Sequence, residues 1–227
     1  MVSATGVVQT PPDRVTIGFT VAGDGKTSDE AAAKVRDDAK AISAGVSGYL
    51  KGNMRWRASQ FSIRPVRPAR CEPADPELPA LVKPAAGSCA IQGYAATMPV
   101  TIETAQVDEA GSVVSLIGRL GGQSVSVGEF GLSDPQGARR QAMRAALVNA
   151  EEQARLIAEG SGAKLGALLR VQDSDYLGED RDMIQDRSSA NAPPPMTVVA
   201  PPPIAIALAP EPIQTRVTLM VSYAIDQ

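Results

Sequence analysis

The feature that most constrains the fold is one long alanine-rich segment in the second half of the chain. It opens with Ser-Asp-Pro-Gln at residues 133–136, which combines helix-capping side chains, an early proline and a glutamine at capping-box spacing. Gly160 and Gly162 end the segment. Because alanine has the highest helix propensity, we expect one helix of about 25 residues, roughly 38 Å long. Its small side chains allow a close approach to a neighbour; they are Ala138, Ala142, Ala145, Ala146, Ala150, Ala154 and Ala158.

Two shorter segments also have helical spacing. Thr-Ser-Asp-Glu at residues 27–30 is a capping box, in which a hydroxyl and a carboxylate satisfy backbone donors that the first turn leaves free. The helix behind it carries a single apolar stripe, so we expect it to lie on a sheet. Residues 106–120 form the second helix, and Gly121 and Gly122 end it. The stripe of the first helix consists of Val35, Ala39, Ile42, Val46 and Leu50.

Alternation of apolar and polar residues predicts the strands. In the second of them we expect Phe61 and Ile63 to point inward, and we expect residues 3–9 to accompany the first strand at the same edge. The last strand is expected to close the sheet. The predicted strands are residues 15–21, 59–66, 92–103, 124–132, 164–172 and 216–225.

The order of these elements predicts an α+β fold. Its first part reads β-α-β-β-α-β, two split β-α-β units that form an antiparallel sheet covered by helices on one face. The long Ala-rich helix and a terminal β-hairpin with a long Pro-rich connection follow. We expect one domain over residues 1–227, with sub-regions 1–132 and 133–227. The uncovered sheet face is then available to a partner.

Two Pro-rich segments interrupt this pattern. Residues 67–91 contain five prolines and read as a long loop, and residues 173–212 include two runs of three prolines. A connection as long as the second is unusual inside a compact domain. One interpretation is an extended hairpin connection. The other is an arm that docks on a neighbouring subunit or a partner strand, because apolar residues such as Ile204, Ile206 and Leu208 lie within it.

The only two cysteines, Cys71 and Cys89, lie in the first of these loops. A closed zinc site needs four ligands, usually cysteine and histidine together, and the chain has no histidine. We therefore expect a disulfide, which closes a loop of about 18 residues and stabilises the fold by roughly 3 kcal/mol in the chain-entropy model. Such a bridge implies an oxidising compartment. The alternative is a pair of free, inert thiols.

The sequence offers little catalytic chemistry. Without histidine, the serine–histidine and cysteine–histidine arrangements are excluded, and the glycine pairs lack the spacing and the lysine of a phosphate loop. We expect no catalytic residue, no cofactor and no metal. We expect one acidic cluster to be solvated rather than to bind calcium, because its spacing matches no EF-hand. It consists of Asp173, Asp175, Glu179, Asp180, Asp182 and Asp186.

Charge restricts the partners. A net charge of −3 and an isoelectric point near 5.1 argue against nucleic-acid binding, which needs a basic stripe. No apolar stretch of about 18 residues is present, so we expect no transmembrane segment. One local basic patch is read either as a solvated face or as a contact to acidic lipid headgroups or an acidic subunit edge. It consists of Arg55, Arg57, Arg64, Arg67 and Arg70.

Several runs, taken in order, resemble the SIMPL-domain family of YggE-like bacterial envelope proteins. Thr-Gly-Val at residues 5–7, followed by Pro-Pro-Asp-Arg-Val at 11–15, is similar to the opening strand of the family and its turn. Phe-Gly-Leu-Ser-Asp-Pro at 130–135 resembles the entry to its long helix. Residues 158–166 resemble the exit from that helix, and residues 217–223 its last strand. The resemblance spans nearly the whole chain.

This resemblance implies an exported protein of the periplasm or cell envelope, without a catalytic centre. It also implies a homo-oligomer, ring-like or channel-like in some members, a link to tolerance of oxidative stress and, in a distant eukaryotic relative, kinase signalling partners. Residues 1–4 have neither the charged nor the apolar part of a signal peptide, which is compatible with export, because a mature or recombinant chain would also begin abruptly with an added Met. The leading hypothesis is a non-enzymatic envelope protein that acts by self-assembly and interaction with envelope partners. The alternatives are a periplasmic module that binds a small ligand or a peptide and, ranked last, a redox or hydrolytic enzyme acting through the cysteines.

Overall fold

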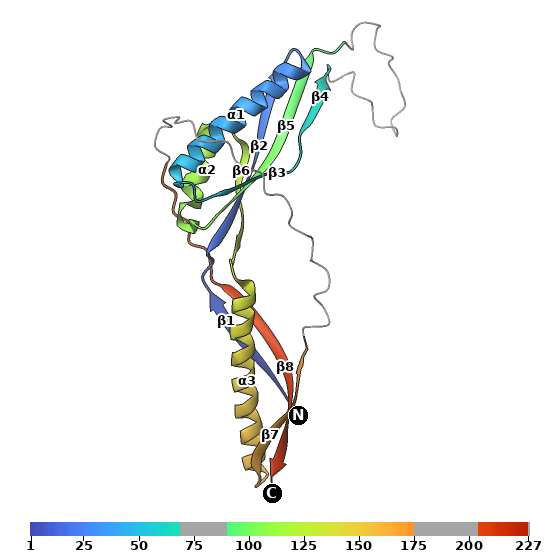
Figure 1. The fold of residues 1–227 in the computed structure, drawn as a ribbon, viewed down its shortest axis with the longest axis vertical. Helices are drawn as coiled ribbons and strands as arrows, with labels where there is room; N and C mark the ends of the chain where they lie inside the picture. The colour runs from blue at the N-terminus through green and yellow to red at the C-terminus, as the bar shows by residue number, and fades with distance from the viewer. Residues whose placement is uncertain (69–89, 175–203, 227) are drawn as a thin grey trace. The chain divides into compact units, whose positions relative to one another are not determined.

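The computed structural model describes residues 1–68, 90–174 and 204–226, and its α+β fold with antiparallel sheets covered by helices confirms the predicted class. The described chain divides into two compact units, coloured along the chain in Figure 1. The two-helix unit comprises residues 14–130 and 204–209. The long-helix unit comprises residues 1–13, 131–174 and 210–226. Each unit has its own sheet and its own buried core.

The two-helix unit is built on a five-stranded sheet of order β3-β5-β2-β6, with β4 also paired to β5. Its two helices, α1 and α2, pack into one core with the sheet. The central pair runs antiparallel with Ile17 opposite Ile102. The elements of this unit are β2 (Arg14–Gly25), α1 (Ser28–Tyr49), β3 (Arg55–Ala58), β4 (Ser62–Val66), β5 (Gly93–Thr104), the 3-10 turn η2 (Val107–Glu109), α2 (Ala110–Arg119) and β6 (Gln123–Gly131).

The start of α1 confirms the predicted capping box. The Thr27 hydroxyl accepts a hydrogen bond of 3.2 Å from the backbone N–H of Glu30, and the Glu30 carboxylate accepts one of 2.7 Å from the backbone N–H of Lys26. The Glu30 N–H belongs to the first turn, whose donors lack intrahelical partners, whereas the Lys26 N–H lies one residue before the Thr27 N-cap. This local chemistry fixes where the helix begins.

The core of the two-helix unit lies between the sheet and α1 and α2. Alternate residues of β2, among them Ile17 and Val21, are fully buried against the stripe of α1 that the sequence predicted. Phe19 and Trp56 meet edge to face, with ring centroids 5.5 Å apart. Because one face of β2 is buried and the other is not, the sheet is covered by helices on one face only within the described residues.

The strand predicted over residues 59–66 is wrong in two respects. Only Ser62–Val66 of it is a strand, β4, and a separate strand, β3, precedes it at Arg55–Ala58. Residues 59–61 between them oppose two residues of β5, between the Ala58–Val100 and Ser62–Thr97 pairs. One extra residue exchanges the faces on which side chains alternate. Ile63 does stand on the helix side, opposite the buried Ala96, but it is 40% exposed because α1 packs mainly on β2 and β5 and covers little of β4. Phe61, also expected to point inward, precedes β4 and is 51% exposed.

The long-helix unit has a three-stranded antiparallel sheet of order β1-β8-β7 with α3 packed against it. Here the sequence interpretation is corrected: residues 3–9 and the last strand do not extend the main sheet but pair with each other, with Gly6 opposite Val217. Residues 164–172 form the third strand, as part of the predicted terminal hairpin. The elements are β1 (Val2–Thr10), α3 (Pro135–Gly160), β7 (Lys164–Asp173) and β8 (Ile213–Asp226).

Six of the alanines of α3 face this sheet, which confirms the close approach to a neighbour that the sequence predicted. Every fourth residue of the helix is buried, and the side chain of Asp134 caps the first turn by accepting a 2.7 Å hydrogen bond from the Gly137 N–H. The Asn149 amide donates a 2.9 Å hydrogen bond to the Thr5 carbonyl of β1, which attaches the helix to the strand backbone. The buried stripe consists of Ala138, Ala142, Ala146, Ala150, Ala154 and Ala158.

Candidate functional site

The most distinctive surface of the long-helix unit begins where α3 lies beside β7. Arg139 of α3 and Asp173 of β7 form an ion pair of 2.8 Å, with side chains only 20% and 18% exposed. Five helical turns, or about 18 residues, separate Arg139 from Ile157, so both lie on the same line of the helix. That line of the helix faces the β7 side of the sheet.

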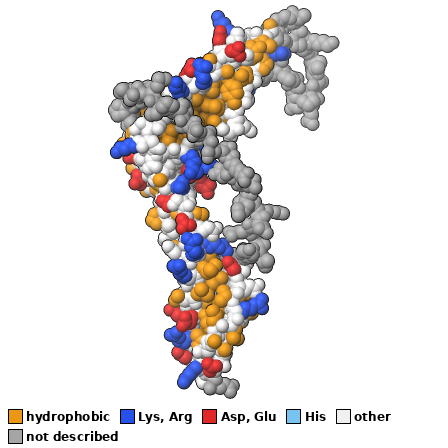
Figure 2. All heavy atoms as spheres, viewed as in Figure 1, with side chains coloured by type: hydrophobic (Ala, Val, Ile, Leu, Met, Phe, Trp, Pro, Cys, Tyr) orange, Lys and Arg blue, Asp and Glu red, His pale blue; other side chains and the backbone are white. Residues whose placement is uncertain are grey.

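Apolar side chains of the sheet lie on the same side. Leu168 and Val171 of β7 pair with Tyr223 and Val221 of β8, whose side chains pack against α3. Ile225 continues the same face of β8. We call Ile157, Leu168, Val171 and Ile225 the apolar seam. Their exposed fractions are 58%, 51%, 44% and 57%. Figure 2 shows hydrophobic side chains gathered in a strip along this unit.

The seam exists because the core of this unit is small. Among the residues that the structure describes, seven buried ones form it, four of them alanines, whereas seventeen form the core of the two-helix unit. Of the sixteen large hydrophobic residues that are exposed within the described part of the chain, ten nevertheless belong to the long-helix unit. A single layer of alanines over three strands buries little apolar area, and so leaves larger side chains at its border in contact with water.

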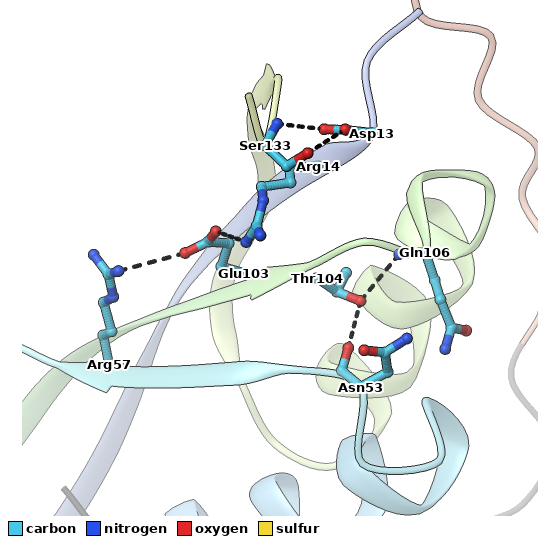
Figure 3. Close-up of polar contacts among 8 residues, drawn as sticks. All are labelled: Asp13, Arg14, Asn53, Arg57, Glu103, Thr104, Gln106 and Ser133. Atoms are coloured by element: carbon cyan, nitrogen blue, oxygen red, sulfur yellow. Dashed lines mark hydrogen bonds and ion pairs between the residues drawn. The ribbon is translucent and has the colours of Figure 1, made fainter. Parts of the chain in front are cut away.

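A polar cluster lies on the uncovered face of the two-helix sheet. Glu103 of β5 pairs with two guanidinium groups, those of Arg14 on β2 and Arg57 on β3, as Figure 3 shows. The Glu103 side chain is 18% exposed, while those of Arg14 and Arg57 are 38% and 50% exposed. Two guanidinium groups therefore flank one carboxylate.

Other polar contacts of this unit stabilise its fold. The Thr104 hydroxyl donates to the Asn53 carbonyl at 2.7 Å and accepts from the backbone N–H of Gln106 at 3.2 Å, which fixes the turn into η2 (Figure 3). The Tyr49 hydroxyl donates to the Glu109 carboxylate at 2.5 Å. This hydrogen bond is the main cause that raises the pKa of Tyr49 above its usual value, and partial burial raises it further. The phenol therefore stays protonated and keeps donating to Glu109, which joins α1 to η2.

A notch on α2 holds an extended segment of the chain itself. A Cβ atom at Gly111 would come within 2.4 Å of the Ile206 carbonyl oxygen and 2.8 Å of the Ile206 Cβ. Leu208, two residues on, packs against the core of the same unit. Only glycine at position 111 leaves room for this close passage of a backbone.

A comparison with protein-family models decides the family. The SIMPL model, described as a protein of unknown function (DUF541), matches residues 1–223. The chain belongs to the SIMPL family. No curated protein matches it. The order of sequence runs that pointed to this family is thereby confirmed, and the two units described above are how this SIMPL-family chain folds.

The structure places only part of the candidate residues of this SIMPL-family chain. Cys71 and Cys89 lie outside the described residues, and so do Arg70 and all of the acidic cluster after Asp173. Asp173 itself pairs with Arg139. Of the basic patch, Arg55, Arg57 and Arg64 are found on the strands β3 and β4.

Two kinds of feature are absent from the residues that the structure describes. No group of three or more His, Cys, Asp or Glu side chains there is arranged to hold a metal ion. Among the same residues, no helix is long and apolar enough to cross a membrane.

Sequence reasoning missed the seam and the Glu103 cluster. The signal for the cluster was present, because Arg14 and Glu103 each stand on the polar side of an alternating strand. What the sequence lacks is the register that joins them across 89 residues.

Proposed function

We propose that this SIMPL-family chain is an exported, non-enzymatic protein of the cell envelope that acts by self-assembly through the apolar seam of its long-helix unit. The observation that carries the proposal is the seam itself: four aliphatic side chains, each 44–58% exposed, at the border of a seven-residue core. Burial of aliphatic groups of this size against a second surface is favourable, because it removes them from water.

A second copy of the chain is the occupant that we favour. Unlike a solvated face, the seam continues the buried core of its own unit: Leu168 pairs with Tyr223, which packs on that core. A partner that covers the seam would therefore complete a core that one copy leaves small. Every copy carries the same surface, and paired identical patches generate closed, symmetric oligomers.

The mass of the chain in solution tests this proposal. One copy has a mass of 23.6 kDa, and we expect size-exclusion chromatography with light scattering to give a multiple of it. The double substitution Ile157→Glu and Leu168→Glu should shift the chain towards one copy. Both side chains are more than half exposed, so the charges should cost the fold little while opposing burial at an interface.

The matched control is Ile63→Glu on β4 of the two-helix unit, an aliphatic side chain that is 40% exposed. It should leave the mass of the oligomer unchanged. A wild-type chain that stays a single copy at all concentrations would exclude self-assembly. An equal effect of Ile63→Glu would exclude the seam as its location.

A second function, peptide binding, is favoured by the notch at Gly111. That notch already accepts an extended apolar segment, Ile206 to Leu208, without strand pairing. A peptide of similar pattern would use the same contacts, and displacement of the chain's own segment would be its cost. A thermal-shift measurement with the peptide Ile-Ala-Ile-Ala-Leu-Ala tests this function, and Gly111→Val should abolish any stabilisation. A wild-type chain that the peptide does not stabilise would exclude this second function.

The resemblance to YggE-like proteins supports two further parts of the proposal, the envelope location and a link to tolerance of oxidative stress. Survival of a deletion strain under peroxide, with and without the wild-type gene, tests the second. The seam variant Ile157→Glu/Leu168→Glu should fail to complement if assembly is what protects the cell. Full complementation by this variant would separate the stress function from assembly.

A further inference from the structure

The face of the two-helix sheet that points away from α1 and α2 differs from the rest of the molecule in charge. We call it the open face; within the described residues of this unit, no helix covers it. Which side chains lie on the open face follows from the register of the strands. Arg55 of β3 stands opposite Glu103, and Arg64 of β4 stands opposite Ala95, both on the side of β5 that the helices leave uncovered.

Four arginines share this open face with two acids. Arg14 and Arg57 flank Glu103, and Arg55 is directly opposite it, while Arg64 lies in one row with Ala95 and Asp24. Over β2, β3, β4 and β5 these four arginines and two acids sum to a charge of +2, although the whole chain carries −3. This opposite sign is a property of the folded sheet, because the four arginines come from three different strands.

The side chains between these arginines are short. Neighbouring strands place hydroxyls, a proline and small residues on the open face, and the Ser62 hydroxyl bonds the Thr97 hydroxyl at 2.9 Å. Long guanidinium side chains therefore extend further from the sheet than anything around them. The short residues of the face are Thr16, Gly18, Thr20, Ala22, Ser62, Thr97, Pro99 and Thr101.

We propose that the open face is a docking surface for a membrane that carries anionic phosphate headgroups. A guanidinium donates paired N–H groups to phosphate oxygens and keeps its charge at every physiological pH. The net positive open face complements an anionic bilayer surface. The rest of the chain is negatively charged, so the bilayer repels it and favours binding through the open face. Glu103 holds Arg14 and Arg57 over the sheet, so it acts as a positioning residue for these two donors.

Binding to vesicles tests the proposal with the full chain. We expect flotation with vesicles of phosphatidylcholine mixed with phosphatidylglycerol, no flotation with phosphatidylcholine alone, and loss of binding as salt is raised. Each basic residue near an anionic surface contributes about a fivefold gain in binding. The double variant Arg55→Ser/Arg64→Ser should therefore bind on the order of thirtyfold more weakly. Neither residue belongs to the Glu103 cluster, so the fold should be retained.

Matched variants make the test specific. Arg36→Ser/Lys40→Ser removes the same charge from α1, on the other side of the sheet, and should leave vesicle binding almost unchanged. Asp24→Asn removes an acid from the open face and should strengthen binding about fivefold. Equal losses from the two double variants would overturn the proposal, since binding would then follow net charge alone. Binding to vesicles of phosphatidylcholine alone, if as strong as binding to the mixed vesicles, would also overturn the proposal.

An acidic surface of a second copy is the competing occupant. If Arg55→Ser/Arg64→Ser lowers the mass of the oligomer and leaves vesicle binding intact, the open face is a protein interface and the membrane proposal fails. Self-assembly through the seam is judged separately, because Ile157→Glu/Leu168→Glu leaves the open face unaltered. Vesicle binding by a single-copy chain would contradict only the proposed assembly.

Discussion

Gly6 of β1 lies against the backbone of α3 so closely that a Cβ atom on it would come within 2.0 Å of the Ala142 carbonyl oxygen. The Ala146 backbone nitrogen would be 2.4 Å away. A helix approaches a strand this closely only where both carry minimal side chains, which here are a glycine facing alanines. The position of α3 on its sheet therefore depends on one missing methyl group.

Gly6→Ala should destabilise the long-helix unit. The atoms in the way are backbone, which cannot turn aside as a flexible side chain does, so the helix must shift and lose part of its packing. Overpacking of this kind costs about 1–3 kcal/mol. Urea denaturation followed by circular dichroism measures the loss.

Gly18→Ala is the control for that substitution. Gly18 also lies in a strand, β2, but a Cβ atom there would have no neighbour within 4 Å. Its free energy of unfolding should change by less than about 0.5 kcal/mol. Equal losses from the two substitutions would show that strand glycines, and not the contact with Ala142, determine the stability.

The helix starts could be predicted from the sequence because their chemistry is local. Thr27 and Glu30 are three residues apart, and their backbone contacts depend on nothing distant. Thr27→Ala should therefore cost about 1 kcal/mol of stability, measured by urea denaturation. Thr27→Ser keeps the hydroxyl and should cost much less. If Thr27→Ala leaves the free energy of unfolding unchanged, tertiary packing alone fixes the start of α1.

Which strands pair could not be predicted, because pairing joins residues far apart in the chain. Val2 pairs with Val221 in a sheet separate from that of β2, although alternation is equally clear in both sheets. The extra residue between β3 and β4 likewise has no local signature. Nor does the sequence show that α1 covers little of β4, which leaves Ile63 exposed on the helix side of the sheet. The seam at Leu168 depends on how far α3 reaches across its sheet. Alternation gives the faces of a strand; only the register shows what lies opposite.

Stability should fall at alkaline pH in a way that involves Tyr49. Its pKa is raised in the fold, chiefly by the hydrogen bond to Glu109. The stabilising effect of the protonated phenol is therefore complete below the unfolded pKa of about 10 and is lost as the pH rises through the folded pKa. Tyr49→Phe should cost about 1 kcal/mol at neutral pH, and its difference from the wild type should shrink in more alkaline solution.

Urea denaturation of both chains between neutral and strongly alkaline pH measures this difference. Tyr223→Phe is a useful comparison, because burial and then Glu151 raise the pKa of Tyr223. Among the wild type, the two single variants and the double variant Tyr49→Phe/Tyr223→Phe, the double variant should lose the least stability at alkaline pH. A constant difference between Tyr49→Phe and the wild type at every pH would contradict the role given to the Glu109 hydrogen bond.

The two cysteines provide a test of the exported location that is independent of the fold. Cys71 and Cys89 lie outside the described residues, and the disulfide between them stays a prediction. We expect chain recovered from an oxidising compartment to be lighter by two hydrogens than the reduced chain, and to resist alkylation until a reductant is added.

Reduction should lower the free energy of unfolding by roughly 3 kcal/mol, because a bridge over about 18 residues restricts the unfolded chain. Cys71→Ser/Cys89→Ser should have the stability of the reduced chain and no longer respond to reductant. The size of the loss is informative in itself. If alkylation shows a bridge but its reduction leaves stability unchanged, the loop it closes would contribute nothing to either core, and the bridge would act within the loop alone. Rapid alkylation of the untreated chain at both cysteines would instead support free thiols, and the argument for an oxidising compartment would then rest on family membership only.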